Sequence, residues 1–189
     1  MSSSTELVDS AYMRIALLAR AEADCIRNRV GAVLVLKRGV FVRGYNGTPN
    51  GMTRCLDGGC FRCSNPKKFP SGQGYDLCLC VHAEQNALLT ATSLGIPVAG
   101  GTIYSTMRPC FGCTKELVQA GVTEIVYLDD WRHKSREVRH IYEKMDFPVT
   151  IRRIQLLDRE GQGFVVGDEM IDEHGHSMAD QEQLSLSVT

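Results

Sequence analysis

Three side chains of metal-ligand type, each at the start of an expected helix, constrain the fold of this chain most strongly. His82 precedes a helix expected over 83–94, and Cys110 and Cys113 lie in the first turn of another, expected over 110–120. The positive N-terminal end of a helix favours the thiolate form of cysteine, which is the form that binds metals. A catalytic zinc takes three protein ligands and keeps a fourth position open. The pattern therefore predicts that two helices begin at one zinc ion.

Glu84 lies two residues after His82 and need not bind the metal itself. Beside a zinc site such a carboxylate can accept and return protons, which makes Glu84 the candidate catalytic residue. Taken alone, the Cys110–Cys113 pair would also fit a redox pair or half of a structural zinc site. A histidine followed closely by glutamate would fit a solvated helix start. Their combination favours catalysis, and Pro109 stands where a first helical turn often has proline.

The composition is that of one ordinary globular domain. The 189 residues are 43% hydrophobic and 23% charged with a net charge of −1, so no basic surplus favours nucleic acid or a membrane surface. No apolar run approaches the ~20 residues that a membrane helix needs, and the N-terminus has no signal-sequence pattern. We therefore expect a cytoplasmic protein. In that reducing compartment its eight cysteines are expected to bind metal rather than to form disulfides.

The order of the expected elements predicts an α/β fold. A helix over 10–23 comes first, followed by strands over 30–36 and 40–45 that form a hairpin around 37–39. Further strands are expected over 102–105, 124–128 and 150–157, and further helices over 83–94, 110–120 and 136–145, with Gly121 as a helix stop. This order predicts a three-layer α/β/α sandwich around a five-stranded mixed sheet. The sheet should be antiparallel in the hairpin and parallel after the metal-binding helices.

The chain divides into a zinc domain and a tail. Residues 1–157 are expected to form the domain, which contains a long cysteine-rich insert at about 46–80. Residues 158–189 form an acidic polar tail with eight acidic residues against Arg159 alone, and we expect this tail to be partly disordered.

Several stretches of the chain resemble the cytidine deaminase superfamily, and more closely its deoxycytidylate (dCMP) deaminase family. The most specific are His82-Ala83-Glu84-Gln85-Asn86-Ala87 and Pro109-Cys110-Phe111-Gly112-Cys113, the H-x-E and P-C-x-x-C pattern of zinc nucleobase deaminases. The Gly44-Tyr45-Asn46-Gly47 loop and the cysteine-rich insert point to the dCMP branch. The similarity covers about residues 7–156 and leaves out the tail. Histidine as the first ligand fits this branch, although tRNA adenosine deaminases and guanine deaminases share it.

The resemblance implies zinc-dependent hydrolytic deamination of dCMP to dUMP and ammonia, which feeds thymidylate synthesis. Glu84 would carry protons, and His82, Cys110 and Cys113 would hold the catalytic zinc. Members of the family are commonly hexamers, activated by dCTP with magnesium and inhibited by dTTP. Relatives place effector phosphates at positions that match Arg27, Asn46 and Gly47. The expected partners are therefore a nucleotide substrate, nucleotide effectors and further copies of the chain.

The substrate contacts are less sharply defined. By resemblance Asn46 hydrogen-bonds the sugar, although an Asn-Gly pair is also a strong turn signal. Trp131 stands where relatives have an aromatic residue near the substrate, often tyrosine, and packing is an equal alternative. The candidates for phosphate binding by residue type are Arg27, Arg29, Arg108, Arg132 and Lys134.

Six cysteines remain outside the catalytic motif. Some relatives hold a structural zinc with ligands that match Cys25 and Cys55, and Cys80 is also placed like a ligand, with the fourth ligand open among the remaining three. Six thiols exceed the needs of one tetrahedral zinc, so two-metal or shared arrangements, and buried free thiols, stay open. The six are Cys25, Cys55, Cys60, Cys63, Cys78 and Cys80.

Other functions compete with dCMP deamination. The enzyme could act on another or a modified cytosine nucleotide. A tRNA adenosine deaminase is disfavoured because the chain lacks the basic surplus that a polyanionic substrate requires. A different class is a catalytically idle zinc module that binds nucleotides. Glu84 argues against it, because a purely structural site would not need that carboxylate.

Overall fold

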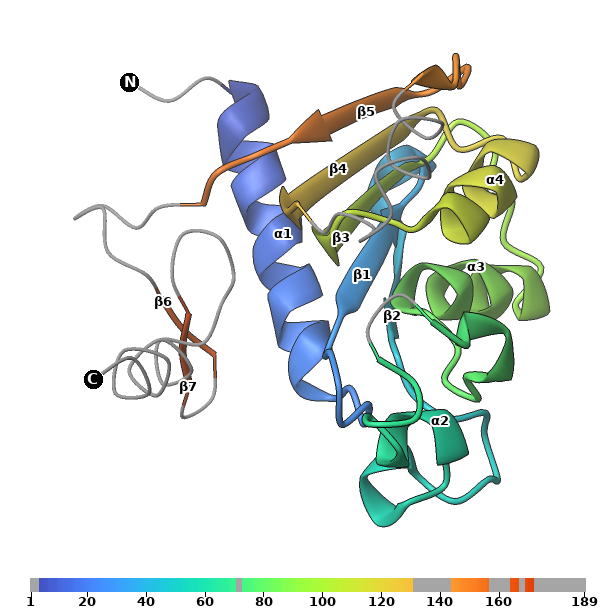
Figure 1. The fold of residues 1–189 in the computed structure, drawn as a ribbon. Helices are drawn as coiled ribbons and strands as arrows, with labels where there is room; N and C mark the ends of the chain where they lie inside the picture. Colours follow the sequence, from blue (N-terminus) through green and yellow to red (C-terminus); the bar gives the residue numbers. More distant parts are fainter. Residues whose placement is uncertain (1–3, 71–72, 131–143, 157–163, 167–168, 172–189) are drawn as a thin grey trace.

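A five-stranded sheet lies between one helix on one face and two helices on the other, as Figure 1 shows. The computed structural model describes residues 4–70, 73–130, 144–156, 164–166 and 169–171. The helices are α1 (Ser4–Ala21), α2 (Phe61–Ser64), α3 (Ala83–Ser93) and α4 (Phe111–Gln119). The strands of the sheet are β1 (Gly31–Val35), β2 (Phe41–Tyr45), β3 (Thr102–Met107), β4 (Glu124–Asp129) and β5 (Thr150–Arg153). The predicted α/β/α sandwich with a mixed five-stranded sheet is confirmed.

The strand order is β2-β1-β3-β4-β5. Strand β1 pairs antiparallel with both β2 and β3, whereas β3, β4 and β5 run parallel to one another. The hairpin turns through a short 3-10 segment, Lys37–Gly39, in which Arg38 and Gly39 have positive φ. The crossovers that parallel strands require place α4 between β3 and β4.

The sheet is buried on both faces because its strands alternate between two apolar cores. On β1, Ala32 and Leu34 pack toward α3 and α4, whereas Val33 packs toward α1. Strand β4 alternates in the same way, with Ile125 packed toward α3 and α4 and Val126 packed toward α1. This period of two, with apolar residues at every position, is typical of a sheet covered on both faces.

Two glycines let the helices approach the sheet closely. A Cβ atom at Gly44 on β2 would lie 2.2 Å from the carbonyl oxygen of Ala83 and 2.5 Å from the amide nitrogen of Ala87, both on α3. A Cβ atom at Gly31 on β1 would lie 2.0 Å from the carbonyl oxygen of Ala16 on α1. Each glycine therefore sets the position of one helix, and Gly44 does so for the helix that begins at His82.

Several boundaries differ from the sequence predictions. Helix α1 begins at Ser4 and ends at Ala21, not at 10 and 23, and β5 ends at Arg153, four residues early. Pro109 precedes the N-cap of α4 and is not in its first turn. The helix expected over 136–145 lies almost entirely outside the described residues.

The structure describes only a small part of the tail. Strands β6 (Phe164–Val166) and β7 (Glu169–Ile171) pair antiparallel as a separate two-stranded sheet. Both strands fall within residues 158–189, the tail that the composition predicts to be partly disordered, and the residues after β7 lie outside the described ones. The proposed division at 157 stays a prediction. Within the described residues, no helix combines the length and the apolar character needed to cross a membrane.

Candidate active site

Helices α3 and α4 begin side by side and bring three ligand atoms together. His82 is the N-cap residue of α3 and Cys110 is the N-cap residue of α4. The Nδ1 atom of His82 lies 3.5 Å from the Sγ atom of Cys110 and 3.3 Å from that of Cys113, and the two sulfur atoms are 3.5 Å apart. A tetrahedral zinc with Zn–S bonds of about 2.3 Å and Zn–N bonds of about 2.0 Å separates such ligand atoms by about 3.5–3.8 Å. The three residues therefore fit one zinc ion.

Backbone contacts position His82. Its amide N–H donates to Oε1 of Gln85 at 3.0 Å, which closes a capping box at the start of α3. The preceding residue, Val81, exchanges two backbone hydrogen bonds with Gly47, of 2.8 and 3.2 Å. Asn86 of α3 also donates to the carbonyl oxygen of Tyr45 at 2.6 Å. The Gly44–Gly47 loop thus holds the first turn of α3 in place.

Glu84 is buried in the first turn of α3, with 4% of its surface exposed. The hydroxyl of Ser105 on β3 donates to its Oε1 atom at 2.8 Å. Burial raises the pKa of Glu84, because a charged carboxylate loses its hydration there. A carboxyl group with a raised pKa beside three metal ligands is suited to accepting and returning protons.

Hydrogen bonds among the three ligand side chains shift their pKa values in opposite directions. The pKa of Cys110 falls to about 4 because of its hydrogen bonds with Cys113 and with His82. The pKa of His82 rises to about 9 through its bond to Cys110, and that of Cys113 rises because of Cys110 and burial. Zinc binding must displace the protons on these side chains, so metal affinity at this site depends on pH.

Asn46 lies beside the site and anchors the loop before β1. Its Oδ1 atom accepts from the amide of Val30 at 2.7 Å, and its Nδ2 atom donates to the carbonyl oxygen of Asn28 at 2.7 Å. Arg27, on the same loop, donates to the carbonyl oxygen of Phe69 in the insert at 2.6 Å. The roles of Asn46, Gly47 and Arg27 toward nucleotides stay predictions.

Arg108 lies at the end of β3, one residue before Pro109. Its backbone amide donates to the carbonyl oxygen of Asp129, and its guanidinium group lies 3.4 Å from a carboxylate oxygen of Asp130. The predicted substrate contacts Trp131 and Arg132, and the phosphate candidate Lys134, lie outside the described residues. They stay predictions.

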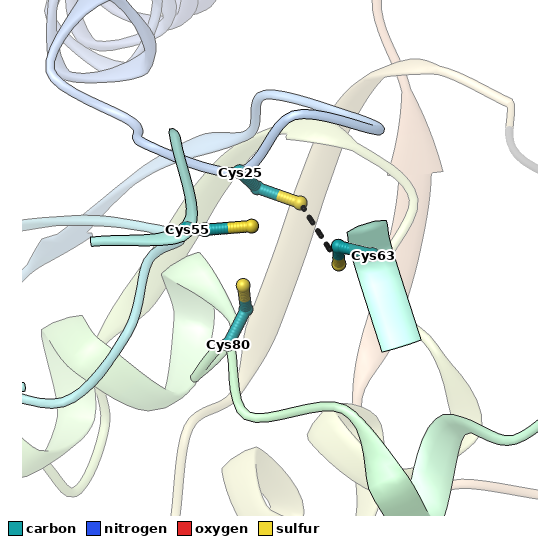
Figure 2. A group of neighbouring side chains, drawn as sticks. All are labelled: Cys25, Cys55, Cys63 and Cys80. Carbon is teal, nitrogen blue, oxygen red and sulfur yellow. Dashed lines mark hydrogen bonds between the residues drawn. The ribbon is translucent and has the colours of Figure 1, made fainter. Parts of the chain in front are cut away.

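The six remaining cysteines form a second cluster of ligand atoms. Figure 2 shows the sulfur atoms of Cys25, Cys55, Cys63 and Cys80 directed at one another, and these four lie within 4.8 Å of one another. They come from the segment after α1, the short 3-10 segment Cys55–Asp57, helix α2 and the segment before α3. Cys60 and Cys78 lie against the same group.

Two further residues of this region were not expected from the sequence. Asp24 is buried and accepts from the amides of Thr48 and Cys55, at 3.3 and 3.4 Å. Arg62 is buried between the cluster and the ring of Tyr75. Burial alone would lower the pKa of Arg62, but its electrostatic interactions with Cys78, Tyr75 and Cys63 raise it. In the sequence, the one feature that points to Asp24 and Arg62 is that each directly precedes a cysteine of the cluster, Cys25 or Cys63.

The fold and the three-ligand site define a zinc-binding α/β domain. Residues 7–129 match the family described as the cytidine and deoxycytidylate deaminase zinc-binding region, and the chain belongs to this family. All eight of its cysteines lie in groups that could hold a metal ion. The predictions of the family and of zinc as its metal are therefore confirmed.

Relatives within this family are similar over the same region. The deoxycytidylate deaminase of Saccharomyces cerevisiae is 40% identical over 66% of this chain and 38% of its own length. That of Mycobacterium phage D29 is 35% identical over 63% of this chain and 92% of its own length. The dCMP deaminase of cyanophage S-TIM5, solved with dCMP and dUMP, covers 82% of this chain at 27% identity with a TM-score of 0.60. The chain spans little more than a third of the yeast relative.

Proposed function

We propose that this protein is a zinc-dependent dCMP deaminase, which hydrolyses dCMP to dUMP and ammonia. The observation that carries this proposal is the buried Glu84 carboxylate, held by Ser105 next to three convergent zinc ligands. Such a constellation supports hydrolysis at an amidine carbon, because it offers a metal with an open position and a proton carrier. The choice of dCMP rests on the relatives, which are named deoxycytidylate deaminases, and on the dCMP and dUMP in the cyanophage structure.

The residues of the chain divide the chemistry among them. His82, Cys110 and Cys113 would hold the zinc, which when bound lowers the pKa of water at its open position toward about 7. Glu84 accepts the two protons of the attacking water one after the other, and it passes the first to N3 of the cytosine ring and the second to the amine, which leaves as ammonia. Ser105 holds the Glu84 carboxylate in position for both transfers. A general acid–base group of this kind typically contributes about 10²–10⁴-fold to the rate.

The nucleotide contacts belong to the same proposal. Asn46 would bind the sugar, and Arg108, Trp131 and Arg132 would lie against the base and the phosphate. We also propose dCTP with magnesium as activator and dTTP as inhibitor, bound near Arg27, Asn46 and Gly47 in a hexamer. A cytoplasmic location is part of the same proposal, because eight cysteines grouped as metal ligands fit a reducing compartment. The cysteine cluster is proposed to hold zinc in a structural role.

The substrate is tested by ammonia release from dCMP, CMP, deoxycytidine, dCTP and a tRNA anticodon stem, each with zinc-loaded protein. Selective turnover of dCMP is expected. Turnover of a different cytosine nucleotide would change the substrate but leave the chemistry intact. No turnover of any of them, in protein that holds its zinc, would favour the nucleotide-binding zinc module instead.

The proton carrier is tested by Glu84→Gln. Because glutamine keeps the shape but cannot carry a proton, turnover should fall by about 10²–10⁴-fold while the zinc content stays unchanged. Glu6→Gln, the same change at an exposed position on α1, which covers the other face of the sheet, is the matched control and should keep full activity. Full activity of Glu84→Gln would remove the proposed role.

A further inference from the structure

The six cysteines outside the active site form two overlapping groups of four. Cys25, Cys55, Cys63 and Cys80 make one group, and the other consists of Cys60, Cys63, Cys78 and Cys80, with all ligand atoms in each group within 4.8 Å of one another. Cys63 and Cys80 belong to both. One tetrahedral zinc uses only four thiolates and would leave two of the six without a metal in either grouping.

We propose that these six thiolates hold two zinc ions in one binuclear cluster. Cys63 and Cys80 bridge the two ions. Cys25 and Cys55 complete the first tetrahedron, and Cys60 and Cys78 complete the second. Two tetrahedra that share two corners need six ligands, which is the number that the cluster offers. This inference goes beyond deamination and does not depend on it.

The sulfur–sulfur distances fit tetrahedral zinc. A tetrahedral centre with Zn–S bonds of about 2.3 Å places neighbouring sulfur atoms about 3.8 Å apart. The Sγ atoms of Cys25 and Cys63 lie 3.9 Å apart in the first group. In the second group, the Cys60–Cys78 and Cys63–Cys78 distances are also 3.9 Å. These three distances match the edge of a zinc tetrahedron, and the other ligand atoms of each group lie within 4.8 Å of one another.

The surroundings offset the charge of such a cluster. Two Zn²⁺ ions and six thiolates carry two net negative charges, which are costly to bury without partners. Arg62 is 4% exposed and lies against Cys78, with its Nε atom bonded to the carbonyl oxygen of Gln73 at 3.0 Å. The amide of Leu79 donates to the Sγ atom of Cys60 at 3.4 Å. A buried guanidinium group beside buried sulfur atoms has an evident role if those sulfur atoms are thiolates.

The cysteines also form the core of the insert. Among the described residues, the apolar cluster of this region consists of the six cysteines and Leu79. The local helical pieces are short, with four residues in α2 and three in each 3-10 segment. Metal binding supplies folding free energy to segments of this kind. Cys80 lies two residues before His82, so the same cluster supports the start of α3.

The test is a zinc count on the intact protein, together with X-ray absorption at the zinc edge. Three zinc ions per chain are expected, and metal–metal scattering should be visible. The double variant Cys110→Ser, Cys113→Ser should lose one zinc ion but keep the metal–metal scattering, since only the active-site zinc is removed. A wild-type count of two without metal–metal scattering would overturn the binuclear cluster in favour of a mononuclear site.

Single variants test the bridging assignment. Cys78→Ser, at the least buried of the six, should lose one zinc ion and the metal–metal scattering. Cys63→Ser should retain at most one of the two cluster zinc ions, because Cys63 is a ligand of both. Retention of two cluster zinc ions by Cys63→Ser would overturn the bridge. If Cys63→Ser does not fold, the wild-type count and scattering decide, and neither depends on turnover of dCMP.

Discussion

Ser105 contacts the candidate active site although it lies 21 residues from Glu84 in the sequence. It lies on β3, on the same face as Ile103, and its hydroxyl reaches Glu84 on α3. The sequence motifs include the zinc ligands and Glu84 because these lie close together along the chain. Ser105 was missed because no short spacing connects it to Glu84; only strand alternation, which places it two residues after the buried Ile103, could have indicated its direction.

We expect Ser105→Ala to lower kcat about tenfold or more. A hydrogen bond to a charged group contributes about 1.5–3 kcal/mol, and about 1.4 kcal/mol corresponds to a tenfold change in rate. Zinc content should not change, since Ser105 is not a ligand. Ser93→Ala is the control, because that hydroxyl donates to the carbonyl oxygen of Thr90 at the far end of α3. An unchanged kcat would mean that burial alone orients Glu84.

At the scale of elements, tertiary packing explains why helix α1 begins earlier than its apolar periodicity predicts. The apolar pattern of α1 becomes clear only at Tyr12, so the first residues of the helix were not predicted. In the structure Asp9 is buried and binds Arg152 of β5 through two hydrogen bonds of 2.6 and 2.9 Å, and Tyr104 donates to it at 2.9 Å. This contact joins residues 143 positions apart. No local sequence pattern could have indicated that this contact would hold the first turns of α1.

Asp9 should make stability depend on pH. Burial alone would raise the pKa of Asp9, but the hydrogen bonds of Arg152 and Tyr104 outweigh it and the pKa is lowered. The carboxylate therefore stabilises the fold above its unfolded pKa of about 3.9, and this contribution is lost as the pH falls through the folded value. Urea unfolding should show Asp9→Asn clearly less stable than wild type at pH 7, with the difference shrinking below about pH 4. A difference independent of pH would contradict this.

Gly44 should be intolerant of a side chain because α3 lies against it. In Gly44→Ala the new Cβ atom would meet backbone atoms at 2.2 and 2.5 Å, so α3 must shift and carry His82 with it. We expect a loss of about 1–3 kcal/mol in the free energy of unfolding together with weaker zinc retention at the active site.

Gly31→Ala is the matched control, because its Cβ atom would meet α1 on the opposite face. It should destabilise the fold by a similar amount and leave zinc retention unaffected. Equal zinc loss in both variants would mean that the site responds to general destabilisation and not to the position of α3.

At the scale of the whole molecule, the proposed regulation requires two coupled sites. Such coupling arises only if an effector binds one state of the assembly more tightly than another. We expect sigmoidal dependence of the rate on dCMP, which becomes hyperbolic with dCTP and magnesium, and lower rates with dTTP. Initial rates and light scattering on the same preparation measure this together with the predicted hexamer. Hyperbolic kinetics unaffected by either triphosphate would remove the regulation without touching the chemistry.

The sequence by itself determined the family and the order of the elements, and it predicted the three zinc ligands and the proton carrier. These features are encoded by residue types at short spacing and by the periods of helices and strands. Only the tertiary structure decided that Ser105 bonds Glu84 and that Arg152 bonds Asp9. It also decided which of the six cysteines belong to both groups of four. Each of these depends on where segments far apart in the chain meet, and that is set by the packing of the whole sheet and its helices.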